Sequence, residues 1–329
     1  MRAFQVVRYG KNEKLHLSEV AKPTLNDNEV LVEIHSASVN QIDAKIRNGE
    51  FKLLMSYKPP FIIGHDFAGV VTQVGAKVTK FKIGDEVFAS CKGTFAEFIT
   101  INENDLALKP KNISMEEAAS IPLVGLTAWQ VLVEKGNLKK GQKVFIQAGS
   151  GGVGTIAIQL AKHLGAYVAT TTSSVNKNLV KKLGADLIID YKAQDFETIL
   201  KDYDLVLNSQ DSKTLEKSMK ILKANGKTIS ISGPPDIYYA NETGLNWVLK
   251  IVIRLLSFKI KKLAKRLHVQ YSFLFMKPDG KQLTEIAALI EAGIIRPVVD
   301  KVFSFVETNE AMSYVEAGRA KGKVVVKVK

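Results

Sequence analysis

The sequence predicts an α/β protein in which a doubly wound parallel sheet is combined with a β-rich unit. Between residues 143 and 232, short apolar strands alternate with segments of helical spacing, which is typical of a parallel sheet with helices on both faces. Before residue 114, strand-like runs are separated by turn residues, which favours a compact barrel-like unit. The length of 329 residues is enough for about two domains.

Each expected element follows from a local pattern. In the first third the expected strands cover 2–7, 30–36, 68–74 and 86–90, and Ser114 with Glu117 forms a capping box that marks a helix start. The middle is expected to form strands at 143–147, 167–171, 187–190, 205–208 and 227–232, and helices at 155–164, 175–183, 195–201 and 212–223. The tail is expected to form helices at 280–292 and 308–317 and strands at 298–305 and 323–328.

Composition excludes several classes of protein. Hydrophobic residues make up 46% of the chain, which excludes a disordered protein, and the single cysteine excludes a disulfide framework and a cysteine-based structural zinc cluster. No uncharged apolar run reaches about 18 residues, and the first ten residues lack the apolar core of a signal peptide. We therefore expect a cytoplasmic protein. The net charge of +13 indicates affinity for nucleic acid, anionic lipid or a polyanionic cofactor.

A glycine-rich turn is the most informative segment. Gly149, Gly151 and Gly154 satisfy G-x-G-x-x-G between an expected strand and an expected helix, as in the Rossmann dinucleotide-binding fold. The first glycine permits the tight turn, the second lets the backbone approach a pyrophosphate, and the third lets the helix pack on the strand. The start of the helix, with Gly152 and Val153, offers free N–H groups to the phosphates.

The following strand predicts which dinucleotide binds. An NAD site places an acid near the end of this strand, but residues 170–177 contain none. Ser173, Ser174 and Lys177 suit a 2′-phosphate instead, and Tyr191 is expected to lie beside the same phosphate. The sequence therefore predicts NADPH as the cofactor, the alternative being an ordinary polar loop.

Several long motifs resemble the zinc-independent quinone oxidoreductase and enone reductase branch of the medium-chain dehydrogenase/reductase superfamily. They are ASVNQIDAKIRNG at 37–49, GHDFAGVV at 64–71, GDEVF at 84–88, LVGLTAW at 123–129, the glycine turn, LGAD at 183–186 and GRAKGKV at 318–324. The resemblance implies a GroES-like catalytic domain, residues 1–122 and 277–329, into which a Rossmann NADP-binding domain, residues 123–276, is inserted. It also implies transfer of a hydride from NADPH to the activated double bond of an enone or 2-alkenal, or to a quinone.

The resemblance also implies which residues act. Asn40 stands where zinc-dependent relatives have a first cysteine ligand, and only His65 and Asp66 remain of their GHE motif, so no metal site is expected. We expect His65 to be a turn or packing residue and Cys91 a plain thiol. Asn40 matches a residue beside the nicotinamide and the substrate, and Lys45 matches a recurrent lysine that would stabilise charge or relay a proton. The alternative for Lys45 is a solvated cation, with the proton supplied by solvent.

Further cofactor contacts are implied at four places. Thr127 matches a residue near the nicotinamide half, and Val153 is expected to pack at the pyrophosphate turn. Ser232 and Gly233 end a strand beside the nicotinamide ribose, and Arg319 reaches toward the cofactor or substrate. Residues 208–212, in the loop expected near the nicotinamide, depart from the pattern of relatives. A non-catalytic dinucleotide sensor or a crystallin-like protein is the alternative function.

Two segments concern partners. Residues 247–266 combine apolar and basic residues, which indicates a surface helix with a lid-like insertion, a contact with anionic membrane, or, less in keeping with the motifs, nucleic-acid binding. A membrane contact would make the protein a peripheral membrane-associated reductase. Residues 269–275 form a charge-free, β-prone run, and relatives pair the equivalent strands of two subunits, so a homodimer is expected.

Overall fold

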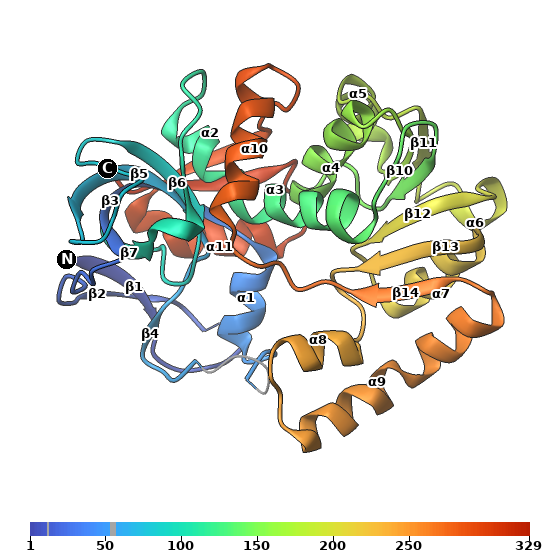
Figure 1. The fold of residues 1–329 in the computed structure, drawn as a ribbon, viewed down its shortest axis with the longest axis horizontal. Helices are drawn as coiled ribbons and strands as arrows, with labels where there is room; N and C mark the ends of the chain where they lie inside the picture. Colours follow the sequence, from blue (N-terminus) through green and yellow to red (C-terminus); the bar gives the residue numbers. More distant parts are fainter. Residues whose placement is uncertain (12, 53–56) are drawn as a thin grey trace. The chain divides into compact units, whose positions relative to one another are not determined.

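The computed structural model describes residues 1–11, 13–52 and 57–329. The chain divides into two compact units: the first comprises Met1–Leu126 and Lys277–Lys329, and the second comprises Thr127–Met276. In Figure 1 the blue and red ends of the ribbon share the first unit. The two ends of the described chain therefore build one unit, and the middle builds the other.

The first unit contains two sheets. The larger runs in the order β15-β16-β3-β5-β6-β8, with β7 also paired to β3, and the smaller in the order β2-β1-β4. Their bounds are β1 (Arg2–Val6), β2 (His16–Glu19), β3 (Glu29–Val39), β4 (Phe61–Ile62), β5 (Asp66–Val74), β6 (Glu86–Ser90), β7 (Phe98–Asn102), β8 (Leu106–Leu108), β15 (Val299–Ser304) and β16 (Lys323–Lys327). Since β16 pairs antiparallel with β3, strands far apart in the sequence hold the sheet together.

Helices complete the first unit. They are α1 (Gln41–Asn48), α2 (Met115–Ala119), α10 (Gly280–Glu291) and α11 (Thr308–Glu316), with short 3₁₀ turns at Glu103–Asp105 and Phe305–Glu307. The predicted capping box is confirmed, because the Glu117 N–H donates to Ser114 Oγ at 3.1 Å and the Ser114 N–H to Glu117 Oε2 at 2.9 Å. A further helix, α3 (Pro122–Trp129), begins in the first unit and ends in the second.

The second unit is built on six parallel strands in the order β11-β10-β9-β12-β13-β14. They are β9 (Lys143–Ile146), β10 (Tyr167–Thr172), β11 (Leu187–Asp190), β12 (Tyr203–Asn208), β13 (Leu222–Ser230) and β14 (Gln270–Phe273). Counted from the glycine turn, this is the order 3-2-1-4-5-6 of a doubly wound sheet. The predicted fold class is confirmed.

Helices lie beside these strands (Figure 1). They are α4 (Gly152–His163), α5 (Lys177–Lys182), α6 (Phe196–Ile199), α7 (Ser212–Lys220), α8 (Ile237–Glu242) and α9 (Trp247–Arg266), with a π-helical turn at Gln130–Lys135 and a 3₁₀ turn at Ser174–Asn176. Buried aromatic residues form part of the core: the rings of Phe145 and Phe196 lie 4.8 Å apart, and Tyr203 packs beside them.

The end of α7 differs from the sequence-based expectation. The helix expected over 212–223 ends at Lys220, and β13 begins at Leu222, earlier than the strand expected from 227. A side chain at Gly226 would place its Cβ 3.0 Å from the Tyr203 carbonyl oxygen, so the chain passes close to β12 here. Asn225 and Gly226 therefore shape an irregular strand rather than end a helix.

Candidate functional site

The glycine turn forms the first part of the site. A Cβ on Gly149 would lie 2.1 Å from Thr170 Oγ1, and one on Gly154 would lie 2.4 Å from the Ala148 carbonyl oxygen. Both glycines are therefore required by packing within the unit. At Gly151 the nearest atom to such a Cβ is the Ala148 oxygen at 3.3 Å, so this glycine is not required by a comparable clash. Of these three glycines, Gly151 is the one whose position is not explained by close contacts within the unit.

The start of α4 fits the phosphates of a dinucleotide. Gly151 is the N-cap and has no side chain, so no side-chain oxygen caps the first N–H groups of α4, which begins with Gly152 and Val153. Beside them, Ser150 Oγ accepts hydrogen bonds from Thr172 at 3.0 Å and from Asn176 at 3.2 Å. The Asn176 Oδ1 atom is buried without a partner, which is consistent with a ligand donor at this place.

The loop after β10 brings together the residues expected at the 2′-phosphate. Ser173 is half-buried, Ser174 and Lys177 are exposed, and Tyr191 is 60% exposed beyond the neighbouring strand. Sequence reasoning missed Asp190, which pairs with Thr172 across β10 and β11. Its carboxylate accepts the N–H of Ser174 at 3.1 Å and that of Lys192 at 3.0 Å.

A buried polar network lies at the carboxyl ends of β9, β12 and β13. Asn208 donates to Gln147 Oε1 at 2.7 Å and accepts from the Ser230 hydroxyl, while Gln147 donates to Ser218 at 2.5 Å. The Ser230 hydroxyl oxygen also accepts the N–H of Gly233 at 2.7 Å. The departure from the family pattern at 208–212 thus supplies an amide that fixes the loop.

The residues expected at the nicotinamide half are less closely connected. Ser232 donates through its hydroxyl to the Gln210 carbonyl at 2.7 Å, and a hollow beside it is lined by Ser212, Glu216, Ser232, Gly233, Pro234, Leu256, Lys259 and Ile260. Thr127 is buried in α3. The structure groups Ser232 and Gly233 at one hollow and places Thr127 on a separate helix.

Asn40 is the centre of a buried cluster in the first unit. Its side-chain amide donates to Asp66 Oδ2 at 2.8 Å, and its amide oxygen accepts from the Lys323 ammonium. Lys323 also donates to Asp66 at 3.2 Å and to the Val39 carbonyl at 3.3 Å. Asp66, fully buried, further accepts the Ser38 hydroxyl at 2.9 Å and the Leu123 N–H at 2.7 Å.

A second chain of contacts begins at the same helix start. The Asn40 N–H donates to Asp43 at 2.7 Å, and the other oxygen of Asp43 lies 2.5 Å from His65 Nδ1. The other ring nitrogen, His65 Nε2, lies 3.1 Å from the Tyr57 hydroxyl. Burial, and then the charge of Asp43, raise the pKa of Tyr57 well above its ordinary value. Sequence reasoning missed Asp43, Tyr57 and Lys323.

Two predicted residues lie outside both clusters. Lys45 is exposed on α1, and Arg319 is exposed beyond the end of α11. Neither side chain takes part in the hydrogen bonds described for the cluster of Asn40 and Asp66. Their predicted roles therefore rest on the family resemblance alone.

The residues present do not fit a zinc ion. Both ring nitrogens of His65 are engaged by Asp43 and Tyr57, and burial raises the pKa of the Cys91 thiol, which disfavours the thiolate that zinc binds. In the described ranges, no three His, Cys, Asp or Glu side chains gather as a metal site.

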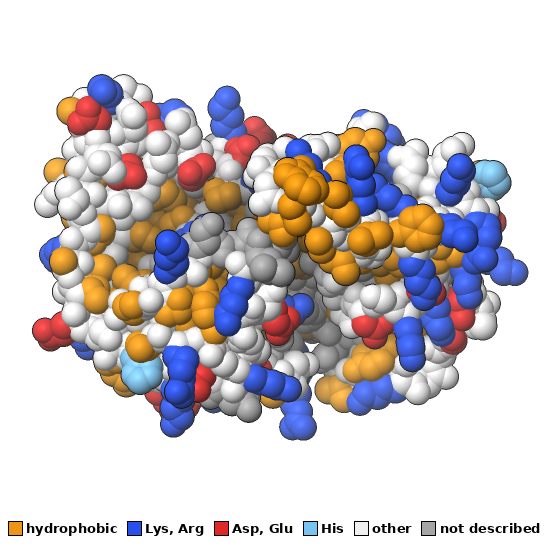
Figure 2. Space-filling view, turned by 90° about the horizontal axis from the view of Figure 1, so that it is seen from below, with side chains coloured by type: hydrophobic (Ala, Val, Ile, Leu, Met, Phe, Trp, Pro, Cys, Tyr) orange, Lys and Arg blue, Asp and Glu red, His pale blue; other side chains and the backbone are white. Residues whose placement is uncertain are grey.

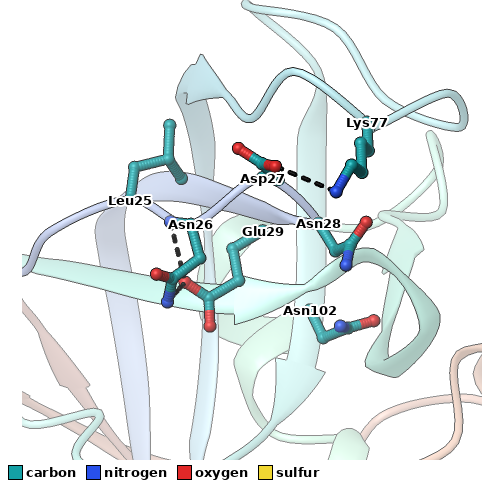
Figure 3. Close-up of a pocket in the computed structure, with 7 residues that line it drawn as sticks. All are labelled: Leu25, Asn26, Asp27, Asn28, Glu29, Lys77 and Asn102. Atoms are coloured by element: carbon teal, nitrogen blue, oxygen red, sulfur yellow. Dashed lines mark hydrogen bonds and ion pairs between the residues drawn. The ribbon is translucent and has the colours of Figure 1, made fainter.

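A surface hollow of the first unit involves none of the predicted residues (Figure 3). It is lined by Leu25, Asn26, Asp27, Asn28, Glu29, Lys77 and Asn102. Asn26 donates to Glu29 at 2.8 Å, and Asp27 forms an ion pair with Lys77 at 3.0 Å. These side chains are hydrogen-bonded or ion-paired with one another, so we assign no ligand to the hollow.

Comparison with known proteins agrees with this geometry. Residues 26–111 match the family described as "Alcohol dehydrogenase GroES-like domain", and residues 183–326 match "Zinc-binding dehydrogenase". The mitochondrial NAD(P)H oxidoreductase RTN4IP1 of Danio rerio is 36% identical over 356 residues, covering 100% of this chain and 91% of the relative. The chain belongs to the medium-chain dehydrogenase/reductase family. Within it, the resemblance to the quinone oxidoreductase and enone reductase branch is confirmed.

Two further relatives of this medium-chain dehydrogenase/reductase are informative. The NADPH-dependent alkenal/one oxidoreductase of Arabidopsis thaliana chloroplasts is 34% identical, covering 99% of this chain and 79% of the relative. The solved structure of the quinone oxidoreductase from Coxiella burnetii has a TM-score of 0.86 at 30% identity, covering 100% of this chain and 99% of that one. The predicted GroES-like and Rossmann architecture is confirmed.

The expectation of a cytoplasmic protein is wrong. RTN4IP1 proteins of zebrafish, mouse, human and cattle, each 35–36% identical across the whole of this chain, are named as mitochondrial. The expectation failed because a single cysteine argues against a disulfide-rich secreted protein without distinguishing among the other compartments. Among the described helices, none has the length and apolar content to cross a membrane.

Proposed function

We propose that the protein is an NADPH-dependent reductase that transfers a hydride to the activated double bond of an enone or 2-alkenal, or to a quinone. One observation carries the proposal: Gly151 and the uncapped start of α4 leave a surface on which a pyrophosphate fits. The similarity to an alkenal/one oxidoreductase and to a quinone oxidoreductase supports the substrate class. NADPH, when bound, supplies the hydride.

The loop after β10 supports the choice of NADPH over NADH. Lys177 and the hydroxyls of Ser173 and Ser174 offer a cation and neutral donors to a 2′-phosphate, with Tyr191 nearby. The nearby acid, Asp190, is held by two backbone N–H groups. These donors offset part of its negative charge, which would otherwise oppose the phosphate.

The cluster around Asn40 supports a positioning function for that residue. All three protons of the Lys323 ammonium have acceptors: Val39, Asn40 and Asp66. The amide protons of Asn40 are directed at Asp66 and, at 3.4 Å, at the Ser38 carbonyl. Because these donors are already used, Asn40 and Lys323 hold the start of α1 in place rather than supply a proton.

Lys45 remains the proposed cation for the negative charge that develops on the substrate oxygen. Its exposed side chain lies on the helix that Asn40 begins. Lys45→Met should lower kcat about ten-fold, the usual size of a modest electrostatic contribution, while Lys82→Met on a turn of the first unit should leave it unchanged. Equal kcat values in wild type and Lys45→Met would contradict this role and would favour the alternative, that Lys45 is a solvated cation.

The decisive experiment follows NADPH oxidation with small enones, 2-alkenals and ortho- and para-quinones, with product analysis to separate double-bond from quinone reduction. We expect turnover that a chelator does not reduce, and less than about 0.1 zinc per chain by elemental analysis. Tight NADPH binding without turnover of any substrate would favour the non-catalytic dinucleotide-binding alternative.

We also propose a two-fold homodimer formed through β14. This strand lies at the edge of the six-stranded sheet, which leaves one side for a partner strand. Part of that edge is already used, because the Phe273 N–H donates to Asp236 at 3.3 Å. Light scattering after size exclusion should give twice the 36.2 kDa of one chain, and a mass of one chain at micromolar concentration would reject the dimer.

A further inference from the structure

Helix α9 carries apolar side chains on two faces, and only one of these faces packs against the rest of the second unit. The inward face comprises Ile253, Ser257, Ile260 and Ala264, all buried. Ile260 and Ala264 pack against Leu215 and Met219 of α7. This face attaches the helix to the sheet, so it needs no further partner.

The other face is exposed from the start of the helix as far as Phe258. Its apolar members are Trp247, Val248, Ile251, Val252, Leu255 and Phe258, exposed by 72, 49, 47, 41, 71 and 64%. The spacing of Val248, Ile251 and Leu255 puts them on one side of the helix. Figure 2 shows hydrophobic side chains gathered over this part of the unit, bordered by Lys and Arg. Contiguous apolar surface of this kind marks an interaction site.

The charged side chains of α9 itself all have positive charge. No acidic residue occurs between Glu242 and Asp279, and α9 itself contains Lys250, Arg254, Lys259, Lys261, Lys262, Lys265 and Arg266. Lys259 is paired with Glu216 of α7 at 2.6 Å. Lys262 and Arg266 are exposed along the second half of the helix, beyond the apolar members. A partner must therefore offer both negative charge and an apolar layer.

We propose that α9 docks on an anionic lipid surface. A bilayer with anionic headgroups matches both requirements, since the apolar side chains enter the interface while the basic ones meet the headgroups. Trp247 at the start of the helix is a side chain that such interfaces favour. A second copy of this chain would bring two basic helices together, and a nucleic acid would leave the apolar side chains in water. The proposal is independent of the reductase activity.

Sedimentation with lipid vesicles tests the proposal on the full chain. We expect binding to vesicles of phosphatidylcholine with phosphatidylserine, weak binding to phosphatidylcholine alone, and release at high salt. Trp247 emission should shift to shorter wavelength on binding. The double variants Ile251→Asp/Leu255→Asp and Lys262→Gln/Arg266→Gln should each bind about ten-fold more weakly or worse.

Matched controls lie in the first unit. Ile83 is 65% exposed, so Ile83→Asp adds the same kind of charge at another apolar site, and Lys82→Gln/Lys111→Gln removes two exposed cations. Both should bind like wild type, and all variants should keep the wild-type circular dichroism and NADPH affinity. The proposal would be overturned if the protein bound no vesicles, or bound neutral and anionic vesicles equally. It would also be overturned if Ile251→Asp/Leu255→Asp dissociated a dimer without changing vesicle binding.

Discussion

Asp66 shows how one side chain can organise a whole site. Its two buried oxygens accept from Ser38, Asn40, Leu123 and Lys323, which come from β3, from the start of α1, from α3 and from β16. A carboxylate can be buried only when it has such partners. In the sequence, Asp66 is visible only as the last residue of a diminished motif, and its partners are far away along the chain.

Breaking this cluster should lower the free energy of unfolding much more than breaking an exposed ion pair does. Asp66→Asn leaves the buried Lys323 ammonium without a carboxylate, so the free energy of unfolding should fall by about 3 kcal/mol. The control Asp27→Asn removes the partner of Lys77 at the surface and should cost about 0.5 kcal/mol. Urea denaturation followed by circular dichroism measures both. Similar losses in the two variants would contradict the importance of the buried pair.

Cofactor choice is also decided by single residues. NADPH should bind at least about ten-fold more tightly than NADH, or about 1.4 kcal/mol. Lys177→Glu should narrow that ratio, because a carboxylate replaces the cation at the expected 2′-phosphate, whereas Lys181→Glu, at an exposed position later on α5, should not. Titration calorimetry gives both affinities, and equal wild-type affinities would reject the assignment.

The site residues that could be predicted from the sequence are those whose role depends on residues close to them along the chain. The glycine turn could be found because strand, glycines and helix follow one another within residues 143–163. Asp190 could not, because its place beside Ser174 depends on the register of β10 against β11. Lys323 and Asn40 are likewise joined only by the pairing of β16 with β3.

At the scale of elements, the turn between β9 and α4 combines two demands on glycine. Gly149 and Gly154 are fixed by contacts inside the unit, whereas Gly151 meets nothing closer than 3.3 Å. Its backbone is extended, with φ −84° and ψ 174°, so an alanine would also suffer no backbone strain. The structural and the ligand-binding demands can therefore be separated by substitution.

Gly151→Ala should keep the fold and weaken NADPH binding, about ten-fold or more, since its methyl group would occupy the surface offered to the pyrophosphate. Gly154→Ala should instead lower stability by about 1–3 kcal/mol, the usual cost of overpacking, because its Cβ would lie 2.7 Å from Gly149 Cα. Thermal unfolding and fluorescence titration separate the effects. A stable Gly151→Ala variant with wild-type affinity would contradict the assigned approach of the ligand.

Elements with a strong period were predicted well, and those shaped by tertiary contacts were not. The helix expected at 280–292 is α10, and the strand expected at 187–190 is β11. The expected start of β13, residue 227, lies five residues after its observed start at Leu222. The reason is that Asn and Gly usually end an element, whereas Asn225 and Gly226 lie within this strand. The short strands β2 and β4 have no pattern of their own and exist through pairing with β1.

At the scale of the whole molecule, buried tyrosines link stability to pH. Burial raises the pKa of Tyr57 and Tyr271 in the folded protein, and of Tyr203 in the core of the second unit. The folded state therefore keeps protons that the unfolded chain releases above its ordinary tyrosine pKa of 10.0. Stability from this source is complete below that pH and is lost as the pH rises.

Tyr203→Phe tests this dependence, because it removes the hydroxyl and keeps the ring. Between pH 8 and about pH 10.5 the variant should lose about 0.8 kcal/mol less unfolding free energy than wild type. Tyr238→Phe, at a position 72% exposed, is the control and should follow wild type. The measurement is urea denaturation at both pH values. Parallel losses in wild type and Tyr203→Phe would contradict the linkage.

The pairing of β16 with β3 has a consequence for protein synthesis. The ribosome makes the whole second unit, through Met276, before it reaches Lys323, and at about 5–20 residues per second β16 follows several seconds later. During that interval the nascent chain can already form its dinucleotide-binding sheet. Asp66 still lacks its ion-pair partner, because Lys323 has not yet been synthesised. A message cut short before Lys323 would therefore yield a chain that folds its middle and leaves its beginning incomplete.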